Sequence, residues 1–135
     1  MAVEWKGRLD PGELVKFVAD FASANLETGQ EPVLNNGEVI DEIISVSATP
    51  EAAALGLTID ASAEREPALI SVDSEGNESV GATSIRIWLS VDPAFQSDPA
   101  FDGDGLPLGI VCTVWIAGAP RARRERTFNA RVAQL

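Results

Sequence analysis

The 135-residue chain contains no histidine and no tyrosine, and its single cysteine is Cys112. Histidine is the side chain that most often serves as general base, proton shuttle or metal ligand near neutral pH. One cysteine cannot form a disulfide within the chain, and the apolar run around Cys112 predicts a buried strand, where a free thiol behaves as a small hydrophobic group. We therefore expect a protein that is not an enzyme and that uses no cofactor or metal.

Basic residues are also scarce, because 10 Lys and Arg stand against 21 Asp and Glu, a formal net charge of −11. Nucleic-acid binding needs a positive surface that displaces counterions, so this balance argues against it. The chain has neither an apolar stretch near the ~18 residues of a membrane span nor a charged-then-apolar leader. We expect a soluble protein of one domain that binds neither nucleic acid nor membrane.

What the chain does contain is a series of short apolar runs separated by turn residues. The clearest alternation lies in Ser84–Val91, where apolar residues that should point inward alternate with residues that should point outward. Residues Leu14–Phe21 fit both helical and strand spacing, and we favour a strand because the rest of the chain is β-like. The predicted strands are Leu14–Phe21, Val39–Ala48, Leu55–Ile59, Ala68–Val72, Ser84–Val91, Leu108–Ala117 and Thr127–Val132.

About seven strands joined by polar turns are typical of an all-β, immunoglobulin-like β-sandwich. We expect residues 10–135 to form this single domain and residues 1–9 to be an N-terminal arm or edge strand. Trp5 has no evident place in a core of about seven strands. It is therefore a candidate contact residue, and the arm could cross to a neighbouring copy.

The one local repeat is Asp92-Pro93-Ala94-Phe95, which returns as Asp98-Pro99-Ala100-Phe101. Phe95 and Phe101 either fold back on the sandwich as a lid or form a protein-binding tip ringed by carboxylates. The carboxylates concerned are Asp98, Asp102 and Asp104. Their spacing lacks the closing glutamate of a calcium loop, which favours a polar, turn-forming loop over a calcium site.

Basic charge is concentrated near the last predicted strand. Two interpretations stay open: a solvated hairpin that offsets acid elsewhere, or an electrostatic contact with an acidic neighbour, possibly another copy of the chain. The basic cluster consists of Arg121, Arg123, Arg124 and Arg126.

Trp88 points outward from its strand, under a loop or at an interface, and we expect Trp115 in the core or at a sheet edge covered by the N-terminal segment.

A series of short motifs also resembles a known family. In order they are Asp10-Pro11-Gly12-Glu13, Phe17-Val18-Ala19-Asp20-Phe21, Glu38-Val39-Ile40, Ser45 to Thr49, Leu55-Gly56-Leu57-Thr58-Ile59, Ile87-Trp88-Leu89-Ser90, Val111-Cys112-Thr113-Val114 and Arg124 to Val132. From about residue 9 to 132 this order resembles the small fiber-tail adaptor proteins of tailed bacteriophages. The chain departs from that pattern around Ser62 to Val80 and from Asp92 to Leu106.

The resemblance implies a non-enzymatic virion protein with an immunoglobulin-like fold, made in the host cytoplasm and present in several copies. Its partners would be other virion proteins and copies of itself, and it would join the tail to fibers or other distal parts. Two alternatives stay open: a capsid decoration or cement protein, and a calcium- or sugar-dependent adhesion module.

Overall fold

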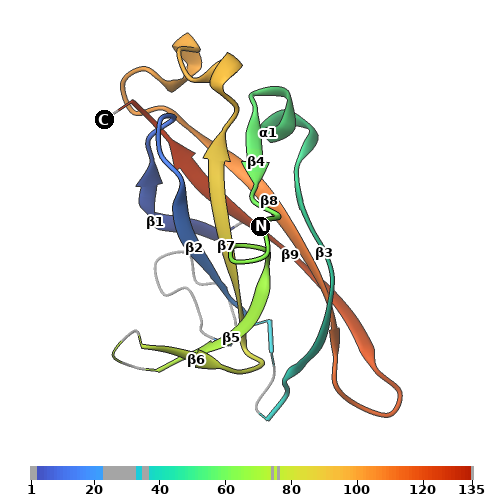
Figure 1. Cartoon of the computed structure of the whole chain (residues 1–135). Helices are drawn as coiled ribbons and strands as arrows, with labels where there is room; N and C mark the ends of the chain where they lie inside the picture. Colours follow the sequence, from blue (N-terminus) through green and yellow to red (C-terminus); the bar gives the residue numbers. More distant parts are fainter. Residues whose placement is uncertain (1–2, 23–32, 35–36, 74, 76, 135) are drawn as a thin grey trace.

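The computed structural model describes residues 3–22, 33–34, 37–73, 75 and 77–134. Its strands form two sheets that stack face to face (Figure 1). The strand order is β1-β9-β8-β3 in the first sheet and β2-β7-β5-β6 in the second, with β4 also paired to β7. The prediction of an all-β sandwich is confirmed, and the immunoglobulin-like assignment within that class stays a prediction.

The strands of the first sheet are β1 (Val3–Leu9), β3 (Ile40–Ala48), β8 (Leu106–Ile116) and β9 (Ala122–Val132). Those of the second sheet are β2 (Val15–Asp20), β4 (Leu57–Ile59), β5 (Ala68–Val72), β6 (Glu78–Val80) and β7 (Ser84–Val91). The described part of the chain thus has nine strands instead of about seven, because β1 and β6 join the predicted set.

The core lies between the inward faces of the two sheets. Strand β7 alternates from Ile85 onward, with Ile85 and Ile87 fully buried, and Ile110 and Val114 of β8 are buried in the same core. This two-residue period is what an antiparallel strand with one covered face requires. The segment Leu14–Phe21, which fits both helical and strand spacing, is a strand, because burial alternates along β2 and its Phe17 is buried opposite β7.

One short helix, α1 (Pro50–Ala54), follows β3. Thr49 is its N-cap and accepts a hydrogen bond from the Ala52 N–H, and Pro50 occupies the first turn. Both residues are favoured at these positions, because a proline lacks the N–H that the first turn leaves unpaired. The sequence predicts only strands on either side of this segment, so the helix is an addition to the predicted elements.

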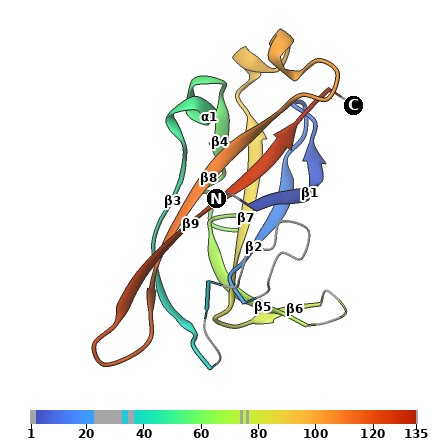
Figure 2. The same cartoon turned by 180° about the vertical axis from the view of Figure 1, so that it is seen from behind.

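The two ends of the sandwich carry different loops (Figures 1 and 2). The connection between β7 and β8, helix α1 and the turn between β1 and β2 lie at one end. The hairpins β8–β9 and β5–β6 lie at the other end. The two charged segments singled out in the sequence are therefore far apart.

Candidate functional site

The connection between β7 and β8, residues 92–105, is called the aspartate loop below. Each copy of its repeat folds into one turn of 3-10 helix, Pro93–Phe95 and Pro99–Phe101. The carboxylates of Asp92 and Asp98 cap these turns by accepting from backbone N–H groups two residues on, each at 2.9 Å. The repeat is therefore a repeated turn in which aspartate caps and proline fixes the backbone.

The phenylalanines of the repeat end in different surroundings. Phe101 is fully buried among the core residues, while Phe95 is half-buried and packs over Gly56. Gln134 holds the loop from the C-terminal side, because its N–H donates to the Phe101 carbonyl at 2.8 Å. The lid alternative describes Phe101, and the expectation of an exposed aromatic pair is wrong for that residue.

The carboxylates of the aspartate loop do not converge on one point. Asp98 caps its turn, and Asp102 and Asp104 are exposed. Among the residues that the structure describes, no group of three or more His, Cys, Asp or Glu side chains is placed to hold a metal ion. The loop bends instead at Gly103 and Gly105, both with positive φ.

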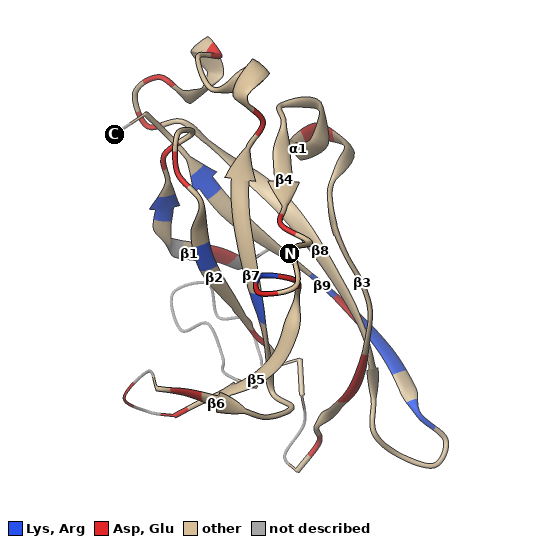
Figure 3. Cartoon of the chain, viewed as in Figure 1, with Lys and Arg blue, Asp and Glu red and all other residues tan. Residues whose placement is uncertain are grey.

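The far ends of β8 and β9, residues 114–126, are called the arginine hairpin below. The Arg121 guanidinium donates to Asp41 at 2.8 Å and to Glu42 at 3.3 Å, both on β3. Hydrogen bonding to Asp41 is the main cause that raises the pKa of Arg121. The same guanidinium lies 4.8 Å above the Trp115 ring, a cation–π contact. Figure 3 shows acidic residues of β3 beside the basic end of β9.

A second arginine of the hairpin is also bound within the chain. Arg124 pairs with Glu38, at 3.0 Å for one of the two contacts, and donates to the Val33 carbonyl at 2.7 Å. Arg123 is exposed and makes no ion pair with the described residues. The Arg126 Nε is buried without a hydrogen-bond partner among those residues. The hairpin thus offsets nearby acid through two arginines and leaves Arg123 exposed.

Two tryptophans have positions that bear on binding. Trp115 lies half-buried on the outer face of β8, between β3 and β9, so the expectation of a core or N-terminally covered position is wrong. Trp88 also faces outward, but the 60–67 loop covers it. The Asp60 N–H donates to the Trp88 carbonyl at 2.9 Å, and Arg65 lies 5.8 Å from the ring. Trp88 therefore packs under a loop, the first of its two predicted alternatives.

Trp5 is anchored inside its own chain. Its ring stacks on Phe128 at 5.4 Å and tilts against Phe17 at 4.9 Å, and its N–H donates to the Val18 carbonyl at 2.7 Å. Strand β1 pairs with β9 in parallel, so Trp5 bridges the two sheets. The expectation that Trp5 is a free contact residue is wrong, because pairing with the last strand is a long-range contact that local sequence does not show.

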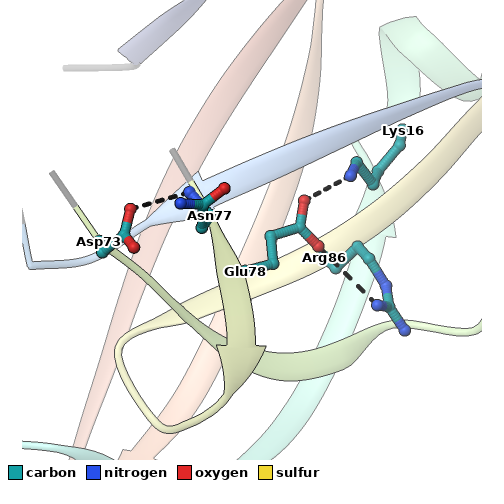
Figure 4. A network of polar contacts seen from close by, with 5 residues as sticks. All are labelled: Lys16, Asp73, Asn77, Glu78 and Arg86. Atoms are coloured by element: carbon teal, nitrogen blue, oxygen red, sulfur yellow. Dashed lines mark hydrogen bonds and ion pairs between the residues drawn. The ribbon is translucent and has the colours of Figure 1, made fainter. Parts of the chain in front are cut away.

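A polar network on the outer face of the second sheet was not foreseen from the sequence (Figure 4). Glu78 of β6 forms ion pairs with Lys16 of β2 and, at 3.8 Å, with Arg86 of β7. Asp73 accepts from the Asn77 N–H at 2.9 Å and closes the β5–β6 hairpin. The network fixes β6 across the sheet and involves no residue of the aspartate loop or of the arginine hairpin.

The lone thiol is chemically quiet in this fold. Cys112 is fully buried on β8, and desolvation raises its pKa to about 12. A thiol reacts through its thiolate, which is scarce near neutral pH at such a pKa. Cys112 is therefore a core residue and not a nucleophile.

In comparisons with known proteins, no family model, curated protein or solved structure matches the chain. No helix in the described ranges is long and apolar enough to span a membrane.

Proposed function

We propose that this chain is a non-enzymatic structural protein of the bacteriophage virion, an adaptor that joins the tail to fibers or other distal tail parts. The phage assignment rests on the sequence resemblance to fiber-tail adaptor proteins. The distribution of the strands between the two sheets supports the immunoglobulin-like fold that the resemblance implies. Strands β2, β5 and β7 share one sheet and β3, β8 and β9 the other, as strands B, D, E and C, F, G do in immunoglobulin domains.

The observation that carries the adaptor role is the separation of two unlike surfaces. The aspartate loop and the arginine hairpin lie at opposite ends of the sandwich (Figure 3). An adaptor must hold two neighbours at the same time, and surfaces at opposite ends let both bind without collision. The loop is acidic throughout, whereas the hairpin mixes both signs. Arg121 pairs with Asp41 and Glu42, Arg124 pairs with Glu38, and Glu125 lies on the hairpin itself.

Arg123 is the residue with which to test the hairpin as a contact. It is exposed and makes no ion pair with the described residues, so reversing its charge breaks no ion pair among them. Arg124 is unsuitable, because its loss would leave Glu38 without this partner. Arg8 of β1 is the matched control, since it is also exposed, also lacks an ion pair with described residues and lies outside the hairpin.

The experiment compares phage particles that carry Arg123→Glu, Arg8→Glu or the unchanged chain. We expect Arg123→Glu to lower the copies per purified particle several-fold by quantitative mass spectrometry, and Arg8→Glu to leave them unchanged. Gold-labelled antibody should mark the tail. Normal incorporation of Arg123→Glu would overturn the hairpin contact, a label on the capsid would replace the adaptor by a decoration protein, and absence from particles would overturn the virion role.

A further inference from the structure

Strand β3 forms one edge of the first sheet. It pairs with β8 on one side, and no described strand pairs with its other side. Both views show this edge open (Figures 1 and 2). The side chains of Ile44, Ser45 and Ser47 are exposed along it, Ile44 at 41%. Alternate residues of such a strand direct their N–H and C=O groups away from the sheet, where another strand can bind.

The protection of this edge is uneven. Proteins guard open edges with charges and β-bulges, and both devices occur in β3. However, Asp41, Glu42 and the two register shifts all lie in the first half of the strand. The second half, Ser45–Ala48, pairs regularly with β8 and carries no charge. It is therefore an open, regular and uncharged template for strand pairing.

The guarding charges are also compensated within the chain. Arg121 donates to both Asp41 and Glu42 across the neighbouring strands. A strand that approaches β3 therefore meets two carboxylates whose charge a guanidinium already offsets. This leaves the first half of the edge less repulsive than its sequence suggests.

We propose that the Ser45–Ala48 segment of β3 pairs antiparallel with the same segment of a second copy, about a twofold axis. The two first sheets, four strands each, would join into one continuous sheet. The charge pattern of the strand selects the antiparallel direction, in which the segment is its own complement. Parallel pairing in register sets Asp41 and Glu42 against their own copies, which is unfavourable. Antiparallel pairing sends them to opposite ends of the joined segment, as a self-complementary twofold contact requires.

This inference goes beyond the proposed function and does not depend on it. It concerns the isolated protein in solution, where neither tail nor capsid is present. Each copy carries a net charge of −11, so long-range repulsion opposes the dimer. Added salt screens that repulsion, and we expect the dimer to strengthen as salt rises.

The first test is disulfide trapping by single cysteines. Residues opposite each other in an antiparallel pair lie within the span of a disulfide. Pairing about a twofold axis sets only one of the combinations 45–45, 45–47 and 47–47 directly opposite. We expect that combination of Ser45→Cys and Ser47→Cys to give cross-linked dimers under mild oxidation at least ~10-fold faster than Ser79→Cys. Ser79 is the matched control, because it is an exposed serine on another edge strand, β6. The buried Cys112 does not compete.

The second test is sedimentation of the unmodified protein and of lysine variants. Ser45→Lys and Ser47→Lys place charges on the edge and should weaken the dimer at least ~10-fold, whereas Ser79→Lys should not. Circular dichroism checks that each variant keeps its strands. A protein that stays monomeric at 200 µM in 0.5 M salt would overturn the inference. So would trapping in which none of the combinations 45–45, 45–47 and 47–47 is faster than Ser79→Cys.

Discussion

Replacement of Phe101 by alanine tests whether the aspartate loop belongs to the core. Phe101 is fully buried, and a buried phenylalanine replaced by alanine costs about 3–5 kcal/mol in transfer and cavity terms. Because the ring is completely covered, we expect about 4 kcal/mol. That is a large share of the roughly 5–15 kcal/mol that stabilises a domain.

The matched control is Phe95→Ala, made in the same tetrapeptide one repeat earlier. Phe95 is only half-buried, so less apolar surface returns to water when its ring is removed. At about 25 cal/mol per Å² of apolar area we expect a loss of about 1–2 kcal/mol. Because the same substitution is made at two degrees of burial, the comparison separates the stability due to burial from the stability due to the local turn.

Urea unfolding at equilibrium, followed through the fluorescence of the 3 tryptophans, measures both losses. With a slope of about 2 kcal/mol per molar, the midpoint of Phe101→Ala should fall by about 2 M and that of Phe95→Ala by about 0.5–1 M. A loss below about 0.5 kcal/mol for Phe101→Ala would refute the buried position. Equal losses in the two variants would mean that burial does not distinguish the repeats.

Two further predictions use the same titration. Burial raises the pKa of Cys112 to about 12, above its unfolded value near 8.5, so the stabilisation by the neutral thiol is complete below ~8.5 and is lost as pH rises toward 12. The unfolding free energy should fall by up to about 1.4 kcal/mol per pH unit above pH ~9, and the chain has no tyrosine whose titration would add to this slope. The Cys112→Ala variant should lack the part of the slope that the thiol causes. Equal slopes in the two proteins would contradict this prediction. Gly105→Ala should cost at least about 2 kcal/mol more than Gly103→Ala, because both have positive φ but only the Cβ at 105 would lie 1.9 Å from the Val132 carbonyl oxygen; equal losses would show that this close approach is absent.

The strands could be predicted where their burial pattern is local. Ala68–Val72 and Ser84–Val91 have the predicted bounds, and the second of these alternates from Ile85 onward because each face meets one environment. Helix α1 also has a local signal, which is a threonine before a proline followed by a run of alanine. The expectation of an all-strand chain outweighed this signal. The information for these elements lies within a few residues.

The partners of the candidate site residues could not be predicted, because they depend on contacts between distant segments. Trp5 needs β9 beside β1, and Arg121 needs the register of β3 against β8. Nor could the sequence separate Phe95 from Phe101, whose local motifs are identical. Only the path of the loop over the sandwich buries one ring more than the other.

The internal ion pairs limit the binding free energy that the arginine hairpin can gain from contact with a neighbouring protein. A partner carboxylate that displaced Asp41 from Arg121 would exchange one exposed pair for another, and such pairs contribute about 0–1 kcal/mol. The same holds for Arg124 and Glu38, which are only partly buried. We therefore expect recognition at this end to depend on Arg123, which has no such pair to give up, and on Trp115, whose ring is half-buried under Arg121. A tryptophan next to an arginine is the kind of pair that carries binding energy at protein interfaces, because both offer a large contact area with few competing solvent bonds.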